Sequence, residues 1–372
     1  MAILVTAFIS LSAMFSCAGG GTEQTSANTS QTVQKQEPAI DGTLLKDFTV
    51  VYPDTAETAK YRFAAEAFCS GVRSAFGVEL RCRLITETPA KHEIVIGRSE
   101  LRPESPKTEC DYGFDKSSVT VRGGNVYIDG AHASGCYQGA KELLKRLSDS
   151  ADGTIPACEF AAEGRVIKLA CVGDSITEGT NSSDRENKTY PIYLQEMLGP
   201  DYYVLNAGLS GYSTCMTDTY AYWKCQQYAD ARSLCPDVII YNLGTNDCNP
   251  SQPEKNWEGT GREELFTKSA HALIDTFLSV NPDVQIYICI PTSLFKVGDD
   301  GWNAVAWQAL NEKHSVPLCK KLAADYGFPT IDLYSWSKQH PEVFTDGLHP
   351  RDETYRDYAA FVYDSIKDTV KK

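Results

Sequence analysis

The chain has 372 residues, 42% of them hydrophobic, and is therefore long enough for two globular domains. Its formal net charge is −14 at pH 7. Nucleic-acid binding needs a basic surface against the phosphates, so this acidic balance argues against a nucleic-acid partner. Acidity also favours solubility, and it does not by itself indicate a cationic partner.

The first 16 residues are almost entirely apolar, and Ser16-Cys17-Ala18-Gly19-Gly20 follows them. This stretch is short for a membrane span and is typical of a signal-peptide core. A small residue before Cys17, with a flexible polar tail behind it, resembles a bacterial lipoprotein signal, which implies a membrane tether through lipidated Cys17. The segment lacks Lys and Arg and carries Met14-Phe15 before the cysteine. Soluble secretion or a retained anchor therefore stays open, and we predict an exported chain with a signal segment at 1–17.

Two further segments precede the part that carries the chemistry. Residues 18–41 are polar with almost no apolar anchor, which predicts a flexible linker. Residues 42–163 are predicted to form a small α/β accessory domain. Its expected elements are strands at 48–52 and 92–97, helices at 58–76 and 135–147, and a hairpin at 118–128 that turns on Gly123-Gly124-Asn125. The pattern loosely resembles the small non-catalytic domain that precedes the catalytic barrel of some glycoside hydrolases.

Residues 164–372 alternate strand and helix patterns and are predicted to form a second domain. Apolar strands are expected at 166–172, 203–206, 237–242, 284–290 and 329–333, with helices at 190–198, 218–229, 263–280, 304–326 and 354–370 between and after them. Such alternation predicts an α/β fold with a parallel sheet that is covered by helices on both faces. In these sheets ligands bind beyond the carboxyl ends of the strands, near the point where the strand order reverses.

The first two motifs follow the first two predicted strands of this domain. Ser175 comes directly after a strand in Val172-Gly173-Asp174-Ser175, where its hydroxyl would stand at the mouth of the sheet. A serine in this place is also a common helix N-cap. Asn206-Ala207-Gly208-Leu209-Ser210-Gly211 follows the second strand, and its glycines allow a backbone N–H to approach developing negative charge. A glycine-rich turn without chemistry is the alternative.

The other two motifs supply an amide, a carboxylate and an imidazole. Gly244-Thr245-Asn246-Asp247 ends the third strand, and the Asn246 amide can donate to an oxyanion without carrying charge, although Asn-Asp is also common in turns. Asp346-Gly347-Leu348-His349 places a carboxylate three residues before a histidine, where it could fix the imidazole tautomer. Among the six histidines, His349 has the best local carboxylate partner.

These four blocks, in this order, resemble the SGNH hydrolases, the GDSL-like esterase and lipase superfamily, over about residues 165–372. The resemblance implies a flavodoxin-like three-layer α/β/α sandwich and chemistry without cofactor or metal. It implies Ser175 as nucleophile, His349 as base and Asp346 as the carboxylate that orients it. The implied oxyanion hole consists of the N–H groups of Ser175 and Gly211 and the Asn246 side chain, with Gly211 chosen as the second glycine of its block.

The 13 cysteines indicate neither a metal site nor a fixed disulfide frame, because their number is odd and no CxxC pair occurs. Cys171 and Cys289 lie in apolar runs and are typical of small buried hydrophobes. Export would permit disulfides, so the pairing stays open. The sequence does not indicate the oligomeric state.

The expected reaction is hydrolysis of a small-molecule or glycan ester through an acyl-serine intermediate. A surface tether and the accessory domain favour an O-acetyl esterase that acts on carbohydrate. Aromatic residues in the loops 248–262 and 291–307, among them Trp257, Phe295 and Trp307, could contact sugar rings or serve as packing anchors. The alternatives are a lysophospholipase or thioesterase with broad acyl specificity and a non-catalytic surface glycan-binding protein.

Overall fold

The computed structural model describes residues 37–105, 113–252, 255–299 and 303–370, and Glu37–Lys372 form one compact unit. The predicted signal segment, the lipidation site Cys17 and most of the predicted linker lie outside the described residues and stay predictions. In the described ranges, no helix combines the length and apolar character needed to cross a bilayer.

The first described elements form a small three-stranded sheet from β1 (Ala39–Ile40), β2 (Thr43–Leu44) and β8 (Thr154–Ile155). Ala39 and Ile40 were predicted to belong to the linker, but they form strand β1, so the ordered chain begins earlier than expected. Ile40 is fully buried in the hydrophobic core beneath the six-stranded sheet. Burial of this side chain extends the ordered chain toward the N-terminus.

A six-stranded mixed sheet follows, with the strand order β4-β3-β5-β7-β6-β9. Helices α1 (Thr58–Phe76) and α2 (Ala133–Asp149) pack together against it, and their apolar faces share one core with its strands. The predicted hairpin is confirmed, because β6 and β7 pair antiparallel across Gly123-Gly124. The strands are β3 (Thr49–Tyr52), β4 (Arg81–Leu84), β5 (Glu93–Ile96), β6 (Lys116–Arg122), β7 (Asn125–Asp129) and β9 (Cys158–Glu163).

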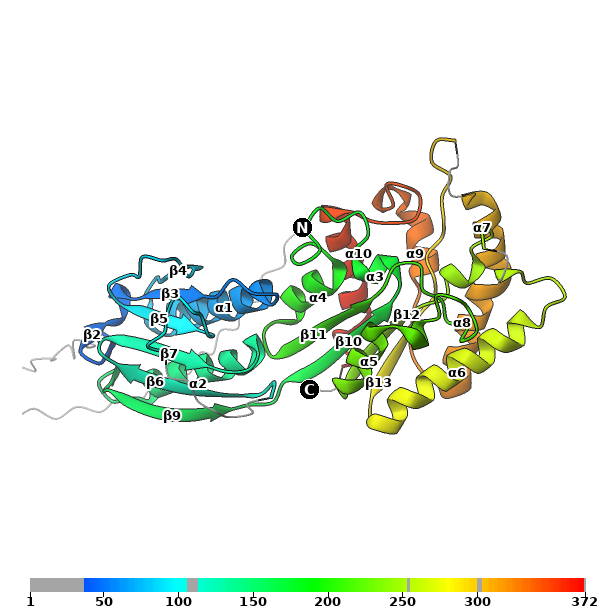
Figure 1. Cartoon of the computed structure of the whole chain (residues 1–372). Coiled ribbons are helices and arrows are strands. Elements are labelled where there is room, and N and C mark those ends of the chain that lie inside the picture. Colours follow the sequence, from blue (N-terminus) through cyan, green and yellow to red (C-terminus); the bar gives the residue numbers. More distant parts are fainter. Residues whose placement is uncertain (1–36, 106–112, 253–254, 300–302, 371–372) are drawn as a thin grey trace, which may run out of the picture. The chain divides into compact units, whose positions relative to one another are not determined.

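The remaining strands form a five-stranded sheet that is parallel throughout, with the order β11-β10-β12-β13-β14 (Figure 1). This is the flavodoxin-like order, in which the chain reverses direction across the sheet at its first strand. The predicted α/β class with a parallel sheet is therefore confirmed. The strands are β10 (Ile167–Gly173), β11 (Tyr202–Gly208), β12 (Val238–Asn242), β13 (Gln285–Cys289) and β14 (Thr330–Ile331).

Helices cover both faces of this sheet, which gives three layers. Side chains of α4 and α10 pack on one face against Leu169 and Cys171, while those of α5, α6 and α8 pack on the other against Ala170 and Val172. Alternate residues of one buried strand thus enter opposite cores. The helices are α3 (Ser175–Glu178), α4 (Tyr190–Leu198), α5 (Gln226–Ser233), α6 (Arg262–Val280), α7 (Ala304–Leu310), α8 (Val316–Tyr326), α9 (Leu333–Gln339) and α10 (Asp352–Ile366).

One predicted helix is wrong in its first part. Residues 218–229 were expected to form one helix, but α5 begins only at Gln226, after a single 3-10 turn at Tyr222–Lys224. The segment before it is a loop in which Ser213 bridges Ala221 and the Asp218 side chain turns into the protein, where it is 2% exposed. Tertiary hydrogen bonds of Asp218 outweigh its local propensity.

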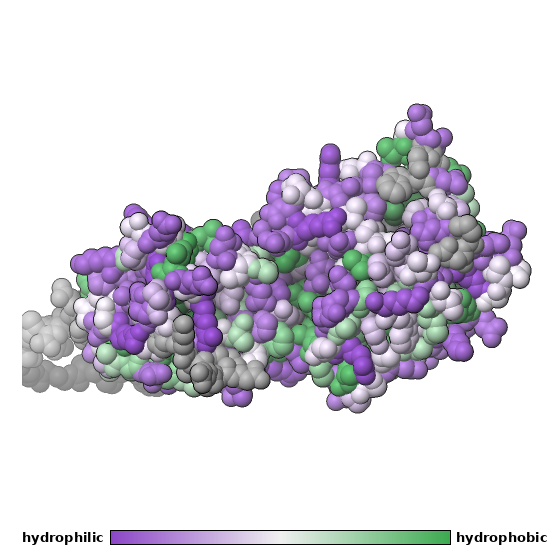
Figure 2. All heavy atoms as spheres, viewed as in Figure 1, coloured by the Kyte–Doolittle hydropathy of each residue, from purple (hydrophilic) through white to green (hydrophobic). Residues whose placement is uncertain are grey.

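The visible face of the molecule is mostly hydrophilic, with apolar residues scattered over it (Figure 2). Among the described residues, the large hydrophobic side chains that are exposed are Leu84, Leu101, Tyr220, Val297 and Val305. Single exposed apolar residues are ordinary on a soluble surface.

Candidate active site

The first three motifs begin side by side because the strands before them are in register. Gly173 at the end of β10 is level with Gly208 of β11 on one side and with Asn242 of β12 on the other. β10 is the strand at which the order reverses, so its carboxyl end opens into the crevice where ligands of such sheets bind. The positions that the sequence singled out therefore converge at one edge of the sheet.

Ser175 is the first residue of the short helix α3, directly after β10. Asp174 is the N-cap of this helix, and its Oδ1 accepts a hydrogen bond from Ile176 N at 3.2 Å. This cap fixes the turn that presents Ser175. Ser175 is 6% exposed. The Ser175 hydroxyl lies 2.8 Å from His349 Nε2.

Asp346 and His349 meet in a turn that Gly347 makes possible. Gly347 has φ +87°, and a Cβ there would lie 2.0 Å from the carbonyl oxygen of Phe295, so a larger residue does not fit. Asp346 Oδ1 accepts from the N–H groups of Leu348 and His349 at 2.9 and 2.7 Å. Its Oδ2 lies 2.8 Å from His349 Nδ1. The structure thus brings Ser175, His349 and Asp346 into one hydrogen-bonded relay.

The carboxylate of Asp346 favours one tautomer of the imidazole. Burial opposes ionisation of Asp346, but the hydrogen bonds from the His349 ring and from two backbone N–H groups hold its pKa well below its usual range. An ionised Asp346 accepts a hydrogen bond from the Nδ1–H group, which leaves Nε2 free to accept a hydrogen bond from the Ser175 hydroxyl. The arrangement is therefore that of a base ready to deprotonate a serine.

The predicted oxyanion donors come from three segments. Ser175 begins α3, so its N–H has no acceptor within that helix. Within the described loops, the N–H of Gly211 donates to no backbone carbonyl. The Asn246 side-chain amide donates one hydrogen bond to the carbonyl oxygen of Tyr212, the residue after Gly211, at 3.1 Å. Its second N–H remains available to donate to an oxyanion.

The structure also separates the roles of the two glycines in the second block. A Cβ at Gly208 would lie 2.2 Å from Glu178 N, so this glycine lets the end of β11 pack against α3. A Cβ at Gly211 would meet no atom within 4 Å. Gly208 therefore serves packing, and the assignment of Gly211 to the oxyanion hole stays a prediction.

The model of the GDSL-like lipase/acylhydrolase family matches residues 171–356. The chain belongs to this family. Membership places this part of the chain among the carboxylic ester hydrolases. All four blocks described above lie within the matched range.

A curated relative is an acetylxylan esterase of Xylanibacter ruminicola, which is 28% identical over 270 residues. The match covers 65% of this chain and 51% of that protein, so the chain spans about half the length of this relative. A carbohydrate acetylesterase family member from Sinorhizobium meliloti is 22% identical, with a TM-score of 0.40 over 55% of this chain and 99% of that one. A lipase/acylhydrolase from Enterococcus faecalis is 20% identical, with a TM-score of 0.41 over 55% and 98%.

Two further polar residues, to which the sequence motifs gave no role, contact the relay or the segment of Ser175. Asn181 donates from Nδ2 to Asp346 Oδ2 at 2.8 Å, the same oxygen that faces the imidazole. Its backbone has φ +69°, a conformation that asparagine tolerates better than most residues, and Tyr355 binds the carbonyl of the preceding Thr180 at 2.7 Å. The sequence offered little indication that Asn181 belongs to the site, because its partner Asp346 lies 165 residues away.

Asp174 is the second of these residues, and its carboxyl is 1% exposed. Among the described residues, no hydrogen bond reaches its Oδ2. Burial raises the pKa of Asp174 to about 6, because removal from water disfavours the charged form. The cap on the nucleophile helix is therefore a carboxyl that gains a proton as the pH falls through about 6.

Replacement of Asp174 tests this titration through stability. The folded-state pKa of about 6 lies above the usual value of about 4, so between these pH values the folded protein binds more protons than the unfolded chain. Its contribution to the free energy of unfolding consequently decreases as pH rises from about 4 to about 6. We expect Asp174→Asn to melt higher than the wild type at pH 7.5, and the gain to be small at pH 4.5. Thermal denaturation at both pH values measures it.

The matched control is Asp47→Asn at an exposed aspartate. This change should alter the melting temperature little at either pH. An Asp174→Asn gain of equal size at pH 4.5 and pH 7.5 contradicts the raised pKa.

Replacement of Asn181 tests its support of Asp346. Two backbone N–H groups and the imidazole still hold the carboxylate in Asn181→Ala, so we expect kcat for p-nitrophenyl acetate to fall by about 3–10-fold with little change in KM. Steady-state kinetics provide the measurement. Ser183→Ala is the control, because Ser183 lies in the same loop but bonds Asp352 instead. Wild-type kcat in Asn181→Ala would rule out the supporting role.

Proposed function

We propose that this protein is a serine esterase that hydrolyses carboxylic esters through an acyl-Ser175 intermediate. The observation that carries the proposal is the relay with 2.8 Å from Ser175 Oγ to His349 Nε2 and 2.8 Å from His349 Nδ1 to Asp346 Oδ2. A hydroxyl, an imidazole and a carboxylate in this order are the parts of a nucleophile with its base and orienting group.

Each step uses a group that lies in place. His349 Nε2 removes the Ser175 proton as Oγ attacks the ester carbonyl, and Asp346 stabilises the imidazolium that forms. The N–H groups of Ser175 and Gly211 and the Asn246 amide donate to the tetrahedral oxyanion. The imidazolium returns its proton to the leaving alcohol, and His349 then deprotonates a water that releases the acid from Ser175.

We propose O-acetyl groups on carbohydrate as the substrate class. The acetylxylan esterase of Xylanibacter ruminicola supports this class as a relative, although this chain spans about half of it. Export with lipidated Cys17 at the membrane, as the sequence predicts, would place such an enzyme where extracellular glycans are met.

An exposed tyrosine that packs against half-buried Tyr212, the residue after Gly211, also supports a sugar substrate. Trp257 and Trp307 are packing anchors, because they are 7% and 2% exposed and donate to the carbonyls of Asp247 and Thr245. Tyr220 is 50% exposed, and its ring lies 5.7 Å from that of Tyr212, the residue after Gly211. Aromatic faces bind the apolar faces of sugar rings, so we assign the sugar contact to this tyrosine pair.

The reaction class is tested by Ser175→Ala. Without the nucleophile, turnover of p-nitrophenyl acetate should fall by about 10⁴-fold or more, and labelling by a fluorophosphonate probe should disappear. Ser365→Ala is the control, since this hydroxyl bonds Phe361 O within α10. Wild-type protein that neither turns over esters nor takes the label would support a non-catalytic glycan-binding protein instead.

The substrate class is tested by Tyr220→Ala. Loss of one ring from the sugar contact should lower kcat/KM for acetate release from acetylated xylan about tenfold. For p-nitrophenyl acetate, which has no sugar, kcat/KM should stay within about twofold of wild type. Leu101→Ala, at another exposed apolar residue, is the control. Equal loss on both substrates contradicts the assignment, and faster turnover of long-chain p-nitrophenyl esters than of acetylated glycans favours the lysophospholipase or thioesterase alternative.

A further inference from the structure

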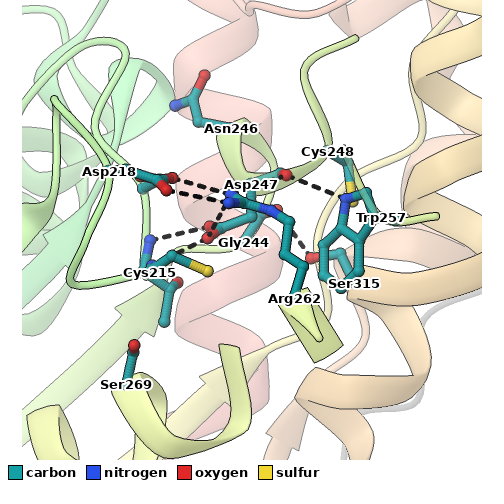
Figure 3. Close-up of polar contacts among 12 residues, drawn as sticks. Cys215, Asp218, Gly244, Asn246, Asp247, Cys248, Trp257, Arg262, Ser269 and Ser315 are labelled. Atoms are coloured by element: carbon teal, nitrogen blue, oxygen red, sulfur yellow. Dashed lines mark hydrogen bonds and ion pairs between the residues drawn. The ribbon is translucent and has the colours of Figure 1, made fainter. Parts of the chain in front are cut away.

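A buried, charged cluster lies beside Asn246 (Figure 3). None of its members belongs to the relay of Ser175, His349 and Asp346. Its members are Arg262 at the start of α6, Asp218 in the loop before α5, and Asp247, which directly follows Asn246. They are 3%, 2% and 0% exposed, respectively. Removing charged groups from water costs free energy, so three of them buried together need mutual hydrogen bonds that offset this cost.

Arg262 joins the other two residues. Its guanidinium donates to Asp218 Oδ1 at 3.0 Å and to Oδ2 at 2.8 Å, a two-pronged geometry that fixes both side chains. It also donates to the carbonyl oxygen of Asp247 at 3.3 Å and lies 3.8 Å from Asp247 Oδ1. Burial opposes ionisation of Asp218, but the bonds from Arg262 and from Ser213 hold its pKa below the ordinary value.

The side chain of Asp247 binds the backbone of the opposite segment. Its Oδ2 accepts from Thr214 N at 2.9 Å and its Oδ1 from Cys215 N at 3.0 Å. Asp218 binds the same segment, because it accepts from the Ser213 hydroxyl at 2.7 Å. Residues 213–215 are therefore held by two carboxylates, and one guanidinium connects these carboxylates.

The two connected segments are those that supply two of the three oxyanion donors. Gly211 lies two residues before Ser213, and Asn246 lies next to Asp247. Figure 3 shows the Asn246 side chain directed away from the cluster, and its amide donates to Tyr212 O at 3.1 Å. Any shift between the two segments would change the distance between the two donors.

We propose that Arg262 is the positioning residue of the oxyanion hole, which through Asp218 and Asp247 fixes the segment of Gly211 relative to that of Asn246. The inference rests on the proposed esterase function. Oxyanion donors act through their preset geometry, so a rigid link between them affects the transition state more than the bound ester. The fork of Arg262 suits this link, because its planar N–H groups meet both Asp218 oxygens and also reach the Asp247 carbonyl.

Within the described residues, Cys215, Asp218 and Asp247 also form the group whose ligand atoms lie within 4.8 Å of one another and could hold a metal ion. The guanidinium of Arg262 already lies among them and supplies the positive charge (Figure 3). The cluster therefore has an internal cation.

The test is Arg262→Met, with Asp218→Asn as a second variant that keeps the side-chain shape if the first does not fold. Fluorophosphonate labelling counts the active sites, so that kcat is expressed per competent site. We expect kcat for p-nitrophenyl acetate to fall about 10–100-fold in Arg262→Met, with KM within about threefold. The inhibition constant of phenylboronic acid, whose tetrahedral anion uses the same donors, should rise by the same factor as kcat falls.

The chain offers a matched control in a second buried ion pair. Arg102 and Glu93, the first residue of β5, are each 3% exposed at the side chain and form a forked pair with Nη2 2.8 Å from Oε1. Arg102→Met should lower the melting temperature by a similar amount and keep kcat within twofold of wild type. The Asp218→Asn/Arg262→Met double variant should lose no more kcat than Arg262→Met, because both changes break one link.

The inference is overturned if Arg262→Met and Asp218→Asn keep wild-type kcat per labelled site. It is equally overturned if their kcat falls while phenylboronic acid binds as it does to wild type. A wild-type protein without turnover or labelling is a different result, which contradicts the proposed function itself.

Discussion

The parallel register of β10 with its two neighbours is the constraint on which the site depends. Gly173 is level with Gly208 and with Asn242, so the three loops that follow leave the sheet at the same height. Parallel pairing sets this register through backbone hydrogen bonds and through two apolar cores that alternate along each strand. A slip of one residue would exchange the two faces and separate Ser175 from the oxyanion segments.

The carboxylates around the site differ in what surrounds them, and this sets what each can do. Asp346 receives four hydrogen bonds, from two backbone N–H groups, the imidazole and Asn181, and these stabilise its charge. Asp174 receives one bond from Ile176 N, and burial raises its pKa to about 6. Asp218 keeps its charge through the guanidinium of Arg262. One edge of a sheet thus holds an orienting carboxylate, a titrating cap and an ion-paired anchor.

Much of the fold and of the site could be predicted, because their signals are local. Apolar runs and helical spacing located the strands, and α4 begins and ends where its pattern does, at Tyr190 and Leu198. The sequence-based prediction failed where a side chain binds a partner far away in the sequence. Asp218 leaves a helical pattern to bind Arg262, 44 residues away, and Asn181 serves a carboxylate 165 residues further along. Neither contact produces a hydrophobic periodicity or a local motif that the sequence alone would reveal.

The sequence by itself determined the chemical inventory: a serine after a strand, an amide after another, and an aspartate three residues from a histidine. It did so because each block is short and its residue types fit one kind of chemistry. Only the tertiary structure decided which groups meet, that Trp257 and Trp307 are buried rather than free to contact a ligand, and that Arg262 joins the two oxyanion segments. The reason is physical: burial and hydrogen-bond distance depend on the whole fold, whereas composition and spacing describe one stretch of chain at a time.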